Sequence, residues 1–400
     1  MPGPLDGVKI LDLTMMVSGP QTTMILGDQG ADVIKIENLA TGDFSRLVTT
    51  ARGGFAAAFL NNNRNKRSLT LNLKDQRGVD VLKDLAKNAD VIIQNFRPGV
   101  MDRLGIGEEV IREVSPSIIY VSISGFGETG PYKDKPVYDP LIQAVSGLAS
   151  IQGGSDDVRP RLVRTIVPDK LTGYATSQAI CAALYSRTRT GEGQHIKISM
   201  LDTLIGFLWG SDMGGHTFVG DELETENAQS FIDLIYETQD GYISVAVQSD
   251  KEWKNLCAAF DKPEWLEDPR FLTAKLRTKN INHRLELTQK VLMTNTAGYW
   301  IEKLEGADVP CAPVLRRKDM IKHPQVLAND TLLYSEHHLA GSLRQARPAP
   351  RFSGTPTELR RGAPALGEHT AEVLKETGVS QEQLDALVEA GVVSIGKPHE

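Results

Sequence analysis

Short apolar segments recur along the first 200 residues, and segments with the spacing of amphipathic helices separate them. Alternation or continuous apolar character over a few residues is typical of strands. We expect strands at Val8 to Leu13, Asp32 to Ile36, Ser68 to Leu73, Val91 to Ile93, Ile118 to Ser124 and His195 to Met200. Strands that alternate with helices predict an α/β fold with a parallel, doubly wound sheet.

The intervening segments predict the helices of this fold. After a turn at Ser18 to Pro20, a helix runs up to the stop signal at Gly30. A second helix is expected at Arg77 to Lys87, and a long one begins near Lys170 and ends at Gly191. The first strand, helix and strand form a βαβ unit. Because the last expected strand, His195 to Met200, follows the long helix, the α/β layer extends to about residue 200.

The pattern changes after Gly220 and predicts a different organisation for the rest of the chain. Residues 1–224 are assigned to a large α/β domain, and residues 225–325, with a strand at Tyr242 to Val247 and helices that carry Trp, to a smaller one. Residues 326–400 are expected to return to the large domain. They contain a strap rich in Pro, Arg and Gly, Ala346 to Pro364, and two helices, Glu368 to Lys375 and Gln381 to Glu389.

Charge and cysteine usage narrow the function classes. The formal net charge of −7 argues against a general nucleic-acid binder, which needs an excess of Lys and Arg. Three widely spaced cysteines support neither a disulfide framework nor a thiolate metal site. The longest apolar runs are too short to span a bilayer, so we expect a cytoplasmic protein with no membrane association.

Several common catalytic and cofactor motifs are absent. The sequence lacks G-x-S-x-G, H-E-x-x-H and C-x-x-C, and the adjacent His337 and His338 are interpreted as surface histidines, so no metal site is expected. The first βαβ turn, Thr14 to Pro20, lacks the glycines of a dinucleotide fingerprint, which argues against a nicotinamide cofactor. An ADP-containing ligand such as coenzyme A (CoA) remains compatible with this fold.

Basic residues gather near the ends of several predicted strands. Arg64, Lys66 and Arg67 lie in a polar run beside one strand, and Lys74, Arg97 and Arg103 follow neighbouring elements. Each of these side chains taken alone is expected to be a solvated surface charge. Taken together on an acidic chain, they are candidates for a phosphate-binding rim.

Asp169 lies where the long helix is expected to begin. One interpretation is an N-cap, whose carboxylate accepts a backbone N–H and complements the helix dipole. The other is a nucleophile, because a helix N-terminus keeps a carboxylate ionised and an ionised carboxylate can attack an electrophile. The two interpretations are compatible.

A set of local motifs resembles one known family, the class III CoA-transferases, also called the L-carnitine dehydratase and bile-acid-inducible protein F family. The resemblance covers nearly the whole chain. The motifs are Leu5 to Leu13, Gly30 to Glu37, Asn65 to Lys74, Asn95 to Gly99, Ser124 to Gly127, Asp169 with Thr172 and Gly173, Thr190 to Gln194, and Met200 to Asp202.

The resemblance implies a site, a reaction and an assembly. In such enzymes the aspartate at the position of Asp169 is the nucleophile, which passes CoA from an acyl-CoA donor to a carboxylic acid acceptor through mixed anhydrides and an aspartyl-CoA thioester. CoA is then a substrate, and no tightly bound cofactor is expected.

The resemblance also implies an assembly and a set of contacts. The large domain is built from both chain ends, the small domain is inserted, and two subunits interlock as a homodimer. The CoA-contacting positions that the resemblance implies are Val17, Ser18, Asn38, Leu71, Asn72, Lys74, Asn95, Phe96, Arg97, Arg103, Lys135, Asp139 and Met200.

Two alternatives stay open. α-Methylacyl-CoA racemases of the same family use a His-Asp pair, and this chain has Tyr138-Asp139. Phenols have an ordinary pKa near 10 and are poor general bases at neutral pH, which favours transfer over racemisation. The second alternative is a paralogue that binds CoA without catalysis, since a helix cap would also retain Asp169.

Several positions depart from the family pattern or concern the acceptor. Asn38 stands where many relatives have Arg, and Pro136 where some have Lys, for which Lys135 is a substitute. The residues at 247–249 do not resemble the glycine-rich loop of formyl-CoA:oxalate transferases, so oxalate is not the expected acceptor. Arg161 and Arg164, just before Asp169, are candidates for binding a second carboxylate of a dicarboxylate, with surface placement as the alternative.

Overall fold

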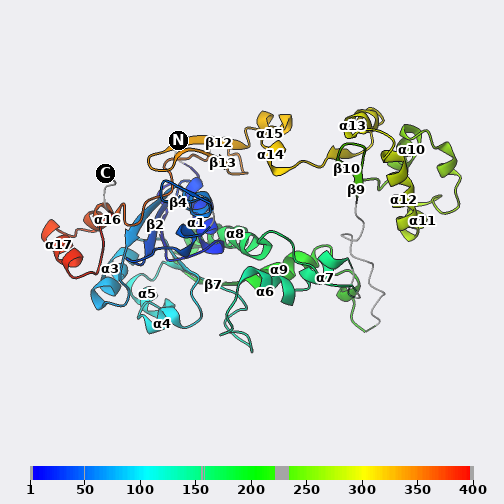
Figure 1. Cartoon of the computed structure of the whole chain (residues 1–400). Helices are drawn as coiled ribbons and strands as arrows, with labels where there is room; N and C mark the ends of the chain where they lie inside the picture. Colours follow the sequence, from blue (N-terminus) through cyan, green and yellow to red (C-terminus); the bar gives the residue numbers. More distant parts are fainter. Residues whose placement is uncertain (1–2, 49, 155, 157, 221–233, 397–400) are drawn as a thin grey trace. The chain divides into compact units, whose positions relative to one another are not determined.

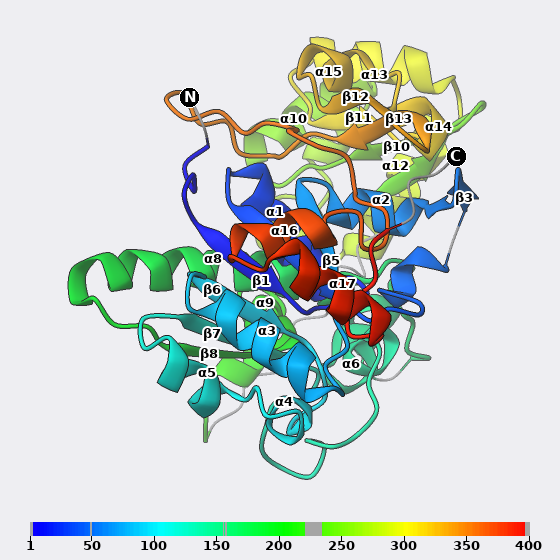
Figure 2. The same cartoon turned by 90° about the vertical axis from the view of Figure 1, so that its left-hand side faces the viewer.

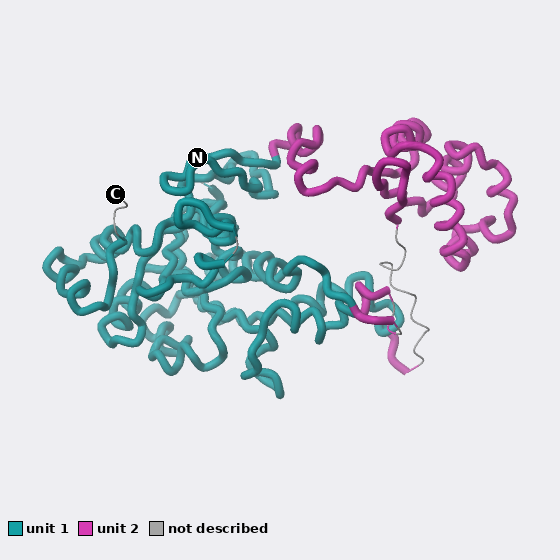
Figure 3. Tube along the Cα trace, viewed as in Figure 1, with its two compact units in different colours: residues 1–149, 161–217, 331–400 teal, residues 150–160, 218–330 magenta. Residues whose placement is uncertain are grey.

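The computed structural model describes residues 3–48, 50–154, 156, 158–220 and 234–396. The chain divides into two compact units (Figure 3). Unit 1 comprises residues 1–149, 161–217 and 331–400, and unit 2 comprises residues 150–160 and 218–330. Unit 1 is therefore built from both ends of the chain.

Unit 1, whose β2 and β7 are labelled in Figure 1, contains a six-stranded sheet. The strand order is β5-β2-β1-β6-β7-β8, and every pair of neighbours is parallel. Its strands are β1 (Lys9–Asp12), β2 (Asp32–Glu37), β5 (Lys66–Thr70), β6 (Val91–Gln94), β7 (Ile119–Ser124) and β8 (His195–Ser199). The strand order reverses between β1 and β6. In such sheets the crevice at the carboxyl ends of the strands, beside this reversal, is where ligands bind.

Helices cover both faces of this sheet, so the predicted doubly wound α/β architecture is confirmed (Figure 2). One face packs against α1 (Ser18–Asp28) and α8 (Val167–Thr190), and the other against α3 (Gln76–Ala86), α5 (Glu108–Val114), α16 (Thr370–Glu376) and α17 (Gln381–Glu389). Further helices before residue 220 are α2 (Ala57–Asn63), α4 (Val100–Arg103), α6 (Asp139–Val145), α7 (Leu148–Gly153) and α9 (Met200–Trp209).

Two short antiparallel ladders complete unit 1. They are β3 (Ala51–Arg52) with β4 (Phe55–Ala56), and β12 (Leu332–His337) with β13 (Gly341–Ala346). The segment after β13 has no regular secondary structure up to α16, as expected for a strap. His337 was interpreted as a surface residue, and this was wrong: it is buried, and its Nε2 lies 2.8 Å from the carbonyl oxygen of Ala363.

Unit 2 has its own core, in which Trp253, Trp265 and Trp300 pack around a small antiparallel sheet. The strand order is β11-β10-β9, with bounds β9 (Ile235–Glu237), β10 (Tyr242–Val245) and β11 (Cys311–Pro313). The helices are α10 (Asp250–Ala259), α11 (Ala274–Lys279), α12 (Ile281–Leu292), α13 (Ala297–Gly306), α14 (Arg317–Met320) and α15 (Pro324–Ala328). Among the described residues, no helix has both the length and the apolar character needed to cross a membrane.

Buried ion pairs join strands of the amino-terminal half of the sheet to each other and to the loop after β2. Lys66 on β5 lies 3.0 Å from the carboxylate of Asp12 on β1, and Lys35 on β2 lies 2.9 Å from that of Asp43. All four side chains are inaccessible to solvent. The strand β5 begins at Lys66, two residues before the predicted start. The polar sequence there did not suggest a buried strand, because the sequence does not reveal that this lysine has a buried carboxylate partner.

Three of the cations proposed for a phosphate rim are instead used inside the protein. Arg64 pairs with Asp28 at 2.7 Å, and Lys66 pairs with Asp12. Arg67 binds Asp32 and two glutamates of α16, which attaches α16 to β5. The prediction was therefore wrong for Arg64, Lys66 and Arg67, because each charge already has a carboxylate partner.

Replacing Lys66 with Met tests the buried network. The substitution leaves Asp12 as an unpaired buried charge, so the free energy of unfolding is expected to fall by about 3–5 kcal/mol. Lys87→Met is the matched control, because Lys87 pairs with Asp84 on the surface and its loss is expected to cost less than about 1 kcal/mol. Urea denaturation at one protein concentration measures both, and equal losses would contradict the structural role of Lys66.

Candidate active site

The loop between β1 and α1 approaches the carboxyl ends of the neighbouring strands and is held there by side chains from two other segments. The side-chain amide of Asn95, just after β6, accepts from Met15 N at 2.9 Å and donates to Met15 O at 2.8 Å. Asp43 Oδ1 accepts from Met16 N at 3.0 Å. Met16 has a left-handed backbone with φ of 70°, and such strain persists where surrounding contacts determine the conformation. These contacts fix the loop just before Ser18.

Asp169 reaches this loop from α8. Gly173, one turn further along α8, packs so close to α1 that a Cβ there would lie 3.1 Å from Ser18 O, and Thr22 Oγ1 donates to Gly173 O at 3.2 Å. This close approach brings the first turn of α8 beside the first turn of α1. The backbone N–H and the hydroxyl of Ser18 lie near the Asp169 carboxylate, and these two donors lower its pKa.

A second carboxylate lies next to Asp169. Asp139 begins α6 and is buried, and its Oδ2 accepts from the backbone N–H of Asp169 at 3.3 Å. Gln143, one turn along α6, donates from Nε2 to Asp139 Oδ1 at 2.6 Å. The same amide group binds the backbone of Val163, so α6 and the segment before α8 are joined at this point.

Burial and the neighbouring charge of Asp139 raise the pKa of Asp169 to about 6, and the two hydrogen bonds from Ser18 reduce this rise. Burial also raises the pKa of Asp139. The expectation that a helix N-terminus simply keeps Asp169 ionised was therefore incomplete, because desolvation and like-charge repulsion outweigh the helix end. At neutral pH the carboxylate is still mainly ionised, and it is more basic than an ordinary aspartate.

Asp169 is not an N-cap. The helix begins at Val167, its N-cap residue is Ile166, and Asp169 lies inside the first turn. Its carboxylate binds Ser18 of another helix and no backbone N–H of its own helix is among its partners. In the described part of the structure, the Asp169 side chain therefore faces the first residue of α1 and does not cap its own helix.

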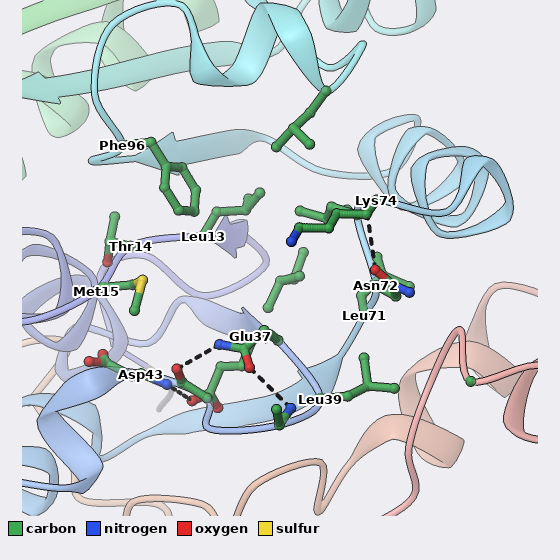
Figure 4. A pocket seen from close by; sticks show the side chains of 17 residues that line it. Leu13, Thr14, Met15, Glu37, Leu39, Asp43, Leu71, Asn72, Lys74 and Phe96 are labelled. Atoms are coloured by element: carbon green, nitrogen blue, oxygen red, sulfur yellow. Dashed lines mark hydrogen bonds between the residues drawn. The ribbon is translucent and has the colours of Figure 1, made fainter. Parts of the chain in front are cut away.

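A cavity of about 510 Å³ opens at the carboxyl ends of β1, β2, β5 and β6 (Figure 4). Its walls are mainly apolar side chains such as Leu13, Leu71 and Phe96, and Lys74 extends toward it from the rim. Glu37 and Asp43, which also line it, already bind Arg46 and Lys35. The predicted contact residues at this cavity are Asn38, Leu71, Asn72, Lys74 and Phe96.

A second cavity, of about 170 Å³, contains Asp169. It lies at the carboxyl ends of β1, β6, β7 and β8, and Phe96 lines both cavities. The tertiary structure therefore brings together predicted residues from segments far apart in the chain. Those at this cavity are Ser18, Asn95, Phe96, Arg97, Lys135, Asp139, Asp169 and Met200.

Other predicted residues lie differently. Val17 and the exposed Arg103 line neither of these two cavities. Asn38 lines the larger one, but its side-chain oxygen accepts from Ala40 N and its amide nitrogen donates to Gly42 O, so it stabilises its own turn. Arg161 and Arg164 are exposed.

The sequence-based reasoning missed three residues that shape the site. Gln143 follows Asp139 at the spacing of one helical turn, and that spacing was a usable signal. Met16 and Asp43 gave no such signal, because a left-handed Met and a carboxylate in a long loop have no sequence signature. In the described part of the chain, no group of three or more His, Cys, Asp or Glu residues is arranged to hold a metal ion.

The sequence matches the model of CoA-transferase family III over residues 5–370, so the chain belongs to this family. It is an enzyme of the CoA-transferase class. Human succinyl-CoA:glutarate CoA-transferase is 34% identical over 99% of this chain and 91% of its own length. Formyl-CoA:oxalate CoA-transferase of Escherichia coli is 32% identical over 97% of this chain and 99% of its own length.

A third relative and a solved structure agree with this assignment. Acetyl-CoA:oxalate CoA-transferase of Acetobacter aceti is 34% identical over 94% of this chain and 96% of its own length. The crystal structure of a CaiB/BaiF family protein from Brucella suis superposes with a TM-score of 0.82 at 30% identity, covering 94% of this chain and all of that one.

Proposed function

We propose that this enzyme transfers CoA from an acyl-CoA thioester to a free carboxylic acid, with Asp169 as the nucleophile. The observation that supports this most directly is the position of the Asp169 carboxylate. It lies in the cavity at the strand ends together with Ser18, and its pKa is raised to about 6. A carboxylate with a raised pKa is a better nucleophile than an ordinary one while it remains ionised at neutral pH.

The first half of the proposed reaction moves CoA onto the enzyme. A carboxylate oxygen of Asp169 attacks the thioester carbonyl carbon, the C–S bond breaks, and CoA leaves as the thiolate. The product is a mixed anhydride between the acyl group and Asp169. The thiolate then attacks Cγ of Asp169, the donor acid leaves as its carboxylate, and an aspartyl-CoA thioester remains. No net proton is taken up or released in these steps.

The second half repeats these steps in reverse order on the acceptor. The acceptor carboxylate attacks Cγ of Asp169 and displaces the CoA thiolate, giving a second anhydride. The thiolate attacks the acceptor carbonyl of that anhydride, which releases the new acyl-CoA and the free Asp169 carboxylate. Because each bond that breaks is matched by an anhydride or thioester that forms, the thioester energy is conserved. We assign to the nearby N–H and hydroxyl of Ser18 the stabilisation of the negative charge that develops when Cγ is attacked, because both groups are hydrogen-bond donors.

The two cavities suggest how acyl-CoA lies in the site. We assign the nucleotide end of CoA to the larger cavity, whose apolar walls suit an adenine ring and whose rim carries Lys74 for a phosphate. The thioester end is assigned to the smaller cavity beside Asp169. Phe96 lines both and would contact the pantetheine arm between them. CoA in this assignment is a substrate, which agrees with the thioester substrates named for the relatives.

No observation favours the two alternatives over transfer. The residue before Asp139 is Tyr138, whose side chain is 70% exposed, so the partner base of a racemase is missing at that position. The second alternative, CoA binding without catalysis, gives no reason for a carboxylate with a raised pKa in the smaller cavity.

We further propose a homodimer. Large apolar side chains are exposed along α6, α8 and α9, three helices that pack against one another, and exposed apolar side chains gathered in one region are typical of interfaces. The exposed residues on these helices are Leu141, Val145, Tyr174, Tyr185, Phe207 and Trp209. Interlocking of the two chains, expected from the family, is part of this proposal.

Replacing Asp169 with Asn tests the nucleophile. The amide cannot form the anhydride, so exchange between acyl-CoA and free acids is expected to fall at least ~1000-fold while CoA affinity stays within about threefold. Mass spectrometry of enzyme incubated with mixed acyl-CoAs and free mono- and dicarboxylic acids should detect CoA on the peptide that holds Asp169. Asp202→Asn, an exposed first-turn aspartate of α9, is the matched control. Full turnover of the Asp169 variant would exclude the mechanism.

The raised pKa of Asp169 predicts a pH profile. Only the ionised carboxylate attacks, so kcat/KM should fall as pH drops through about 6, where Asp169 takes up its proton. Asp139→Asn removes the neighbouring negative charge, and the midpoint of this acid limb should move to lower pH. The midpoint is obtained from kcat/KM measured from pH 5 to 8 for the wild type and for Asp139→Asn. Unfolding is monitored in parallel over the same pH range. An unmoved midpoint would show that Asp139 does not act on Asp169.

The homodimer predicts a particle mass in sedimentation equilibrium of about twice the 43.8 kDa of one chain. The double substitution Phe207→Glu and Trp209→Glu places two charges in the proposed interface. It should shift the equilibrium from the dimer toward the single chain. Val388→Glu on α17 is a control outside this surface. A wild-type protein that sediments as a single chain would refute the proposal.

A further inference from the structure

A chain of hydrogen bonds crosses three neighbouring strands and ends at the loop that contains Phe96. Gln94, the last residue of β6, donates from Nε2 to Ser122 Oγ on β7 at 3.0 Å. Ser122 Oγ lies 2.9 Å from His195 Nε2 at the start of β8. At the other end, Phe96 N donates to Gln94 Oε1 at 2.8 Å. Gln94 and Ser122 are both buried.

The backbone N–H of Phe96 determines the direction of this chain. An N–H can only donate, so the atom of Gln94 that faces it is the carbonyl Oε1, and the NH₂ group faces Ser122. Ser122 Oγ accepts from that NH₂ and is then free to direct its own hydrogen to His195 Nε2. This arrangement requires Nε2 to be unprotonated, which is the neutral imidazole with its hydrogen on Nδ1.

The surroundings of His195 favour this neutral form. The ring of Tyr120 meets the imidazole edge-on at 5.1 Å, and the Tyr120 hydroxyl donates to Ile106 O, so the imidazole has a rigid neighbour. Burial lowers the pKa of His195, and Lys197 lowers it further. The charged groups that face the ring are Lys197 on β8, Glu108 and Arg112 on α5, and Glu128 in the loop after β7. His195 also borders a polar cavity of about 370 Å³.

We propose that His195 is a positioning residue, which acts through Ser122 and Gln94 to hold the backbone at Phe96 in the conformation that binds CoA. The proposal rests on the assignment of residues 95–97 to the CoA site, because Phe96 lines both cavities of that site. His195 lines neither cavity, and the hydrogen bonds through Ser122 and Gln94 are what connect it to Phe96.

Protonation of His195 reverses one bond of the chain. Nε2 then carries a hydrogen and becomes a donor toward Ser122, which already accepts from Gln94. The hydroxyl hydrogen of Ser122 loses its acceptor, and a buried donor without a partner is unfavourable. The structure therefore links acid pH to a less firmly held Phe96, independently of the titration of Asp169.

Calorimetric titration with CoA and steady-state kinetics test the role of His195. His195→Ala and Ser122→Ala each break the chain and should raise the Kd for CoA and the KM for acyl-CoA about three- to tenfold, with kcat changed less than about twofold. Hydrogen exchange of the peptide that contains Phe96 should become faster. His195→Gln places a neutral amide near Nε2, so it should restore the Kd to within about twofold of wild type.

The pH dependence separates positioning from a purely structural role. The ratio of wild-type Kd to that of His195→Gln cancels the titration of the CoA phosphates, and it should rise as pH falls from 7 to 5. A flat ratio, or a His195→Ala variant with unchanged Kd and unchanged exchange at Phe96, would overturn the proposal. His283→Ala, an exposed histidine of unit 2, is the control for the substitution itself.

Arg97→Ala distinguishes this proposal from the assignment of the CoA site. If Arg97→Ala leaves CoA affinity unchanged, the loop does not bind CoA and the assignment itself is wrong. If Arg97→Ala weakens binding and His195→Ala does not, the site stands and the role of His195 is refuted. If Arg97→Ala and His195→Ala both weaken CoA binding, and His195→Gln alone restores it, the CoA site and the role of His195 are both supported.

Discussion

Two buried lysines fix the loop on which the site depends. Lys35 and Lys66 each pair with a buried carboxylate, and each also donates to a main-chain oxygen, one in the β1–α1 loop and one in the first turn of α1. Lys35 binds Thr14 O at 2.9 Å and Lys66 binds Pro20 O at 3.0 Å, so both the loop and the first turn of the following helix are held. Buried ion pairs contribute little net stability, but they tolerate few alternative arrangements. We infer that these pairs specify the loop that presents Ser18.

The site itself combines opposing electrostatic requirements. Asp169 and Asp139 are neighbouring carboxylates in a partly buried environment, which is unfavourable for both charges. The donors of Ser18 near Asp169 and the hydrogen bond from Gln143 to Asp139 offset part of that cost. The result is a carboxylate that is more basic than usual and still ionised near neutral pH. A site selected only for stability would have no reason to keep this pair.

The segment after β6 connects the two cavities to the rest of the sheet. Asn95 binds the backbone of Met15 and so joins β6 to the β1–α1 loop. Phe96 lines both cavities, and its N–H binds Gln94, which continues the hydrogen-bond chain to Ser122. The reversal of strand order between β1 and β6 is what places these two loops side by side.

The sequence by itself determined the parallel α/β sheet and the family, because apolar periodicity and local motifs are properties of contiguous residues. It also singled out Asp169, but it did not determine the environment of this residue. Only the tertiary structure showed that Lys66 is a buried structural cation, that Asn38 turns into its own loop, and that Asp139 raises the pKa of Asp169. Burial, charge pairing and the direction of a hydrogen bond such as that of His195 depend on residues far apart in the chain, and a linear pattern does not contain them.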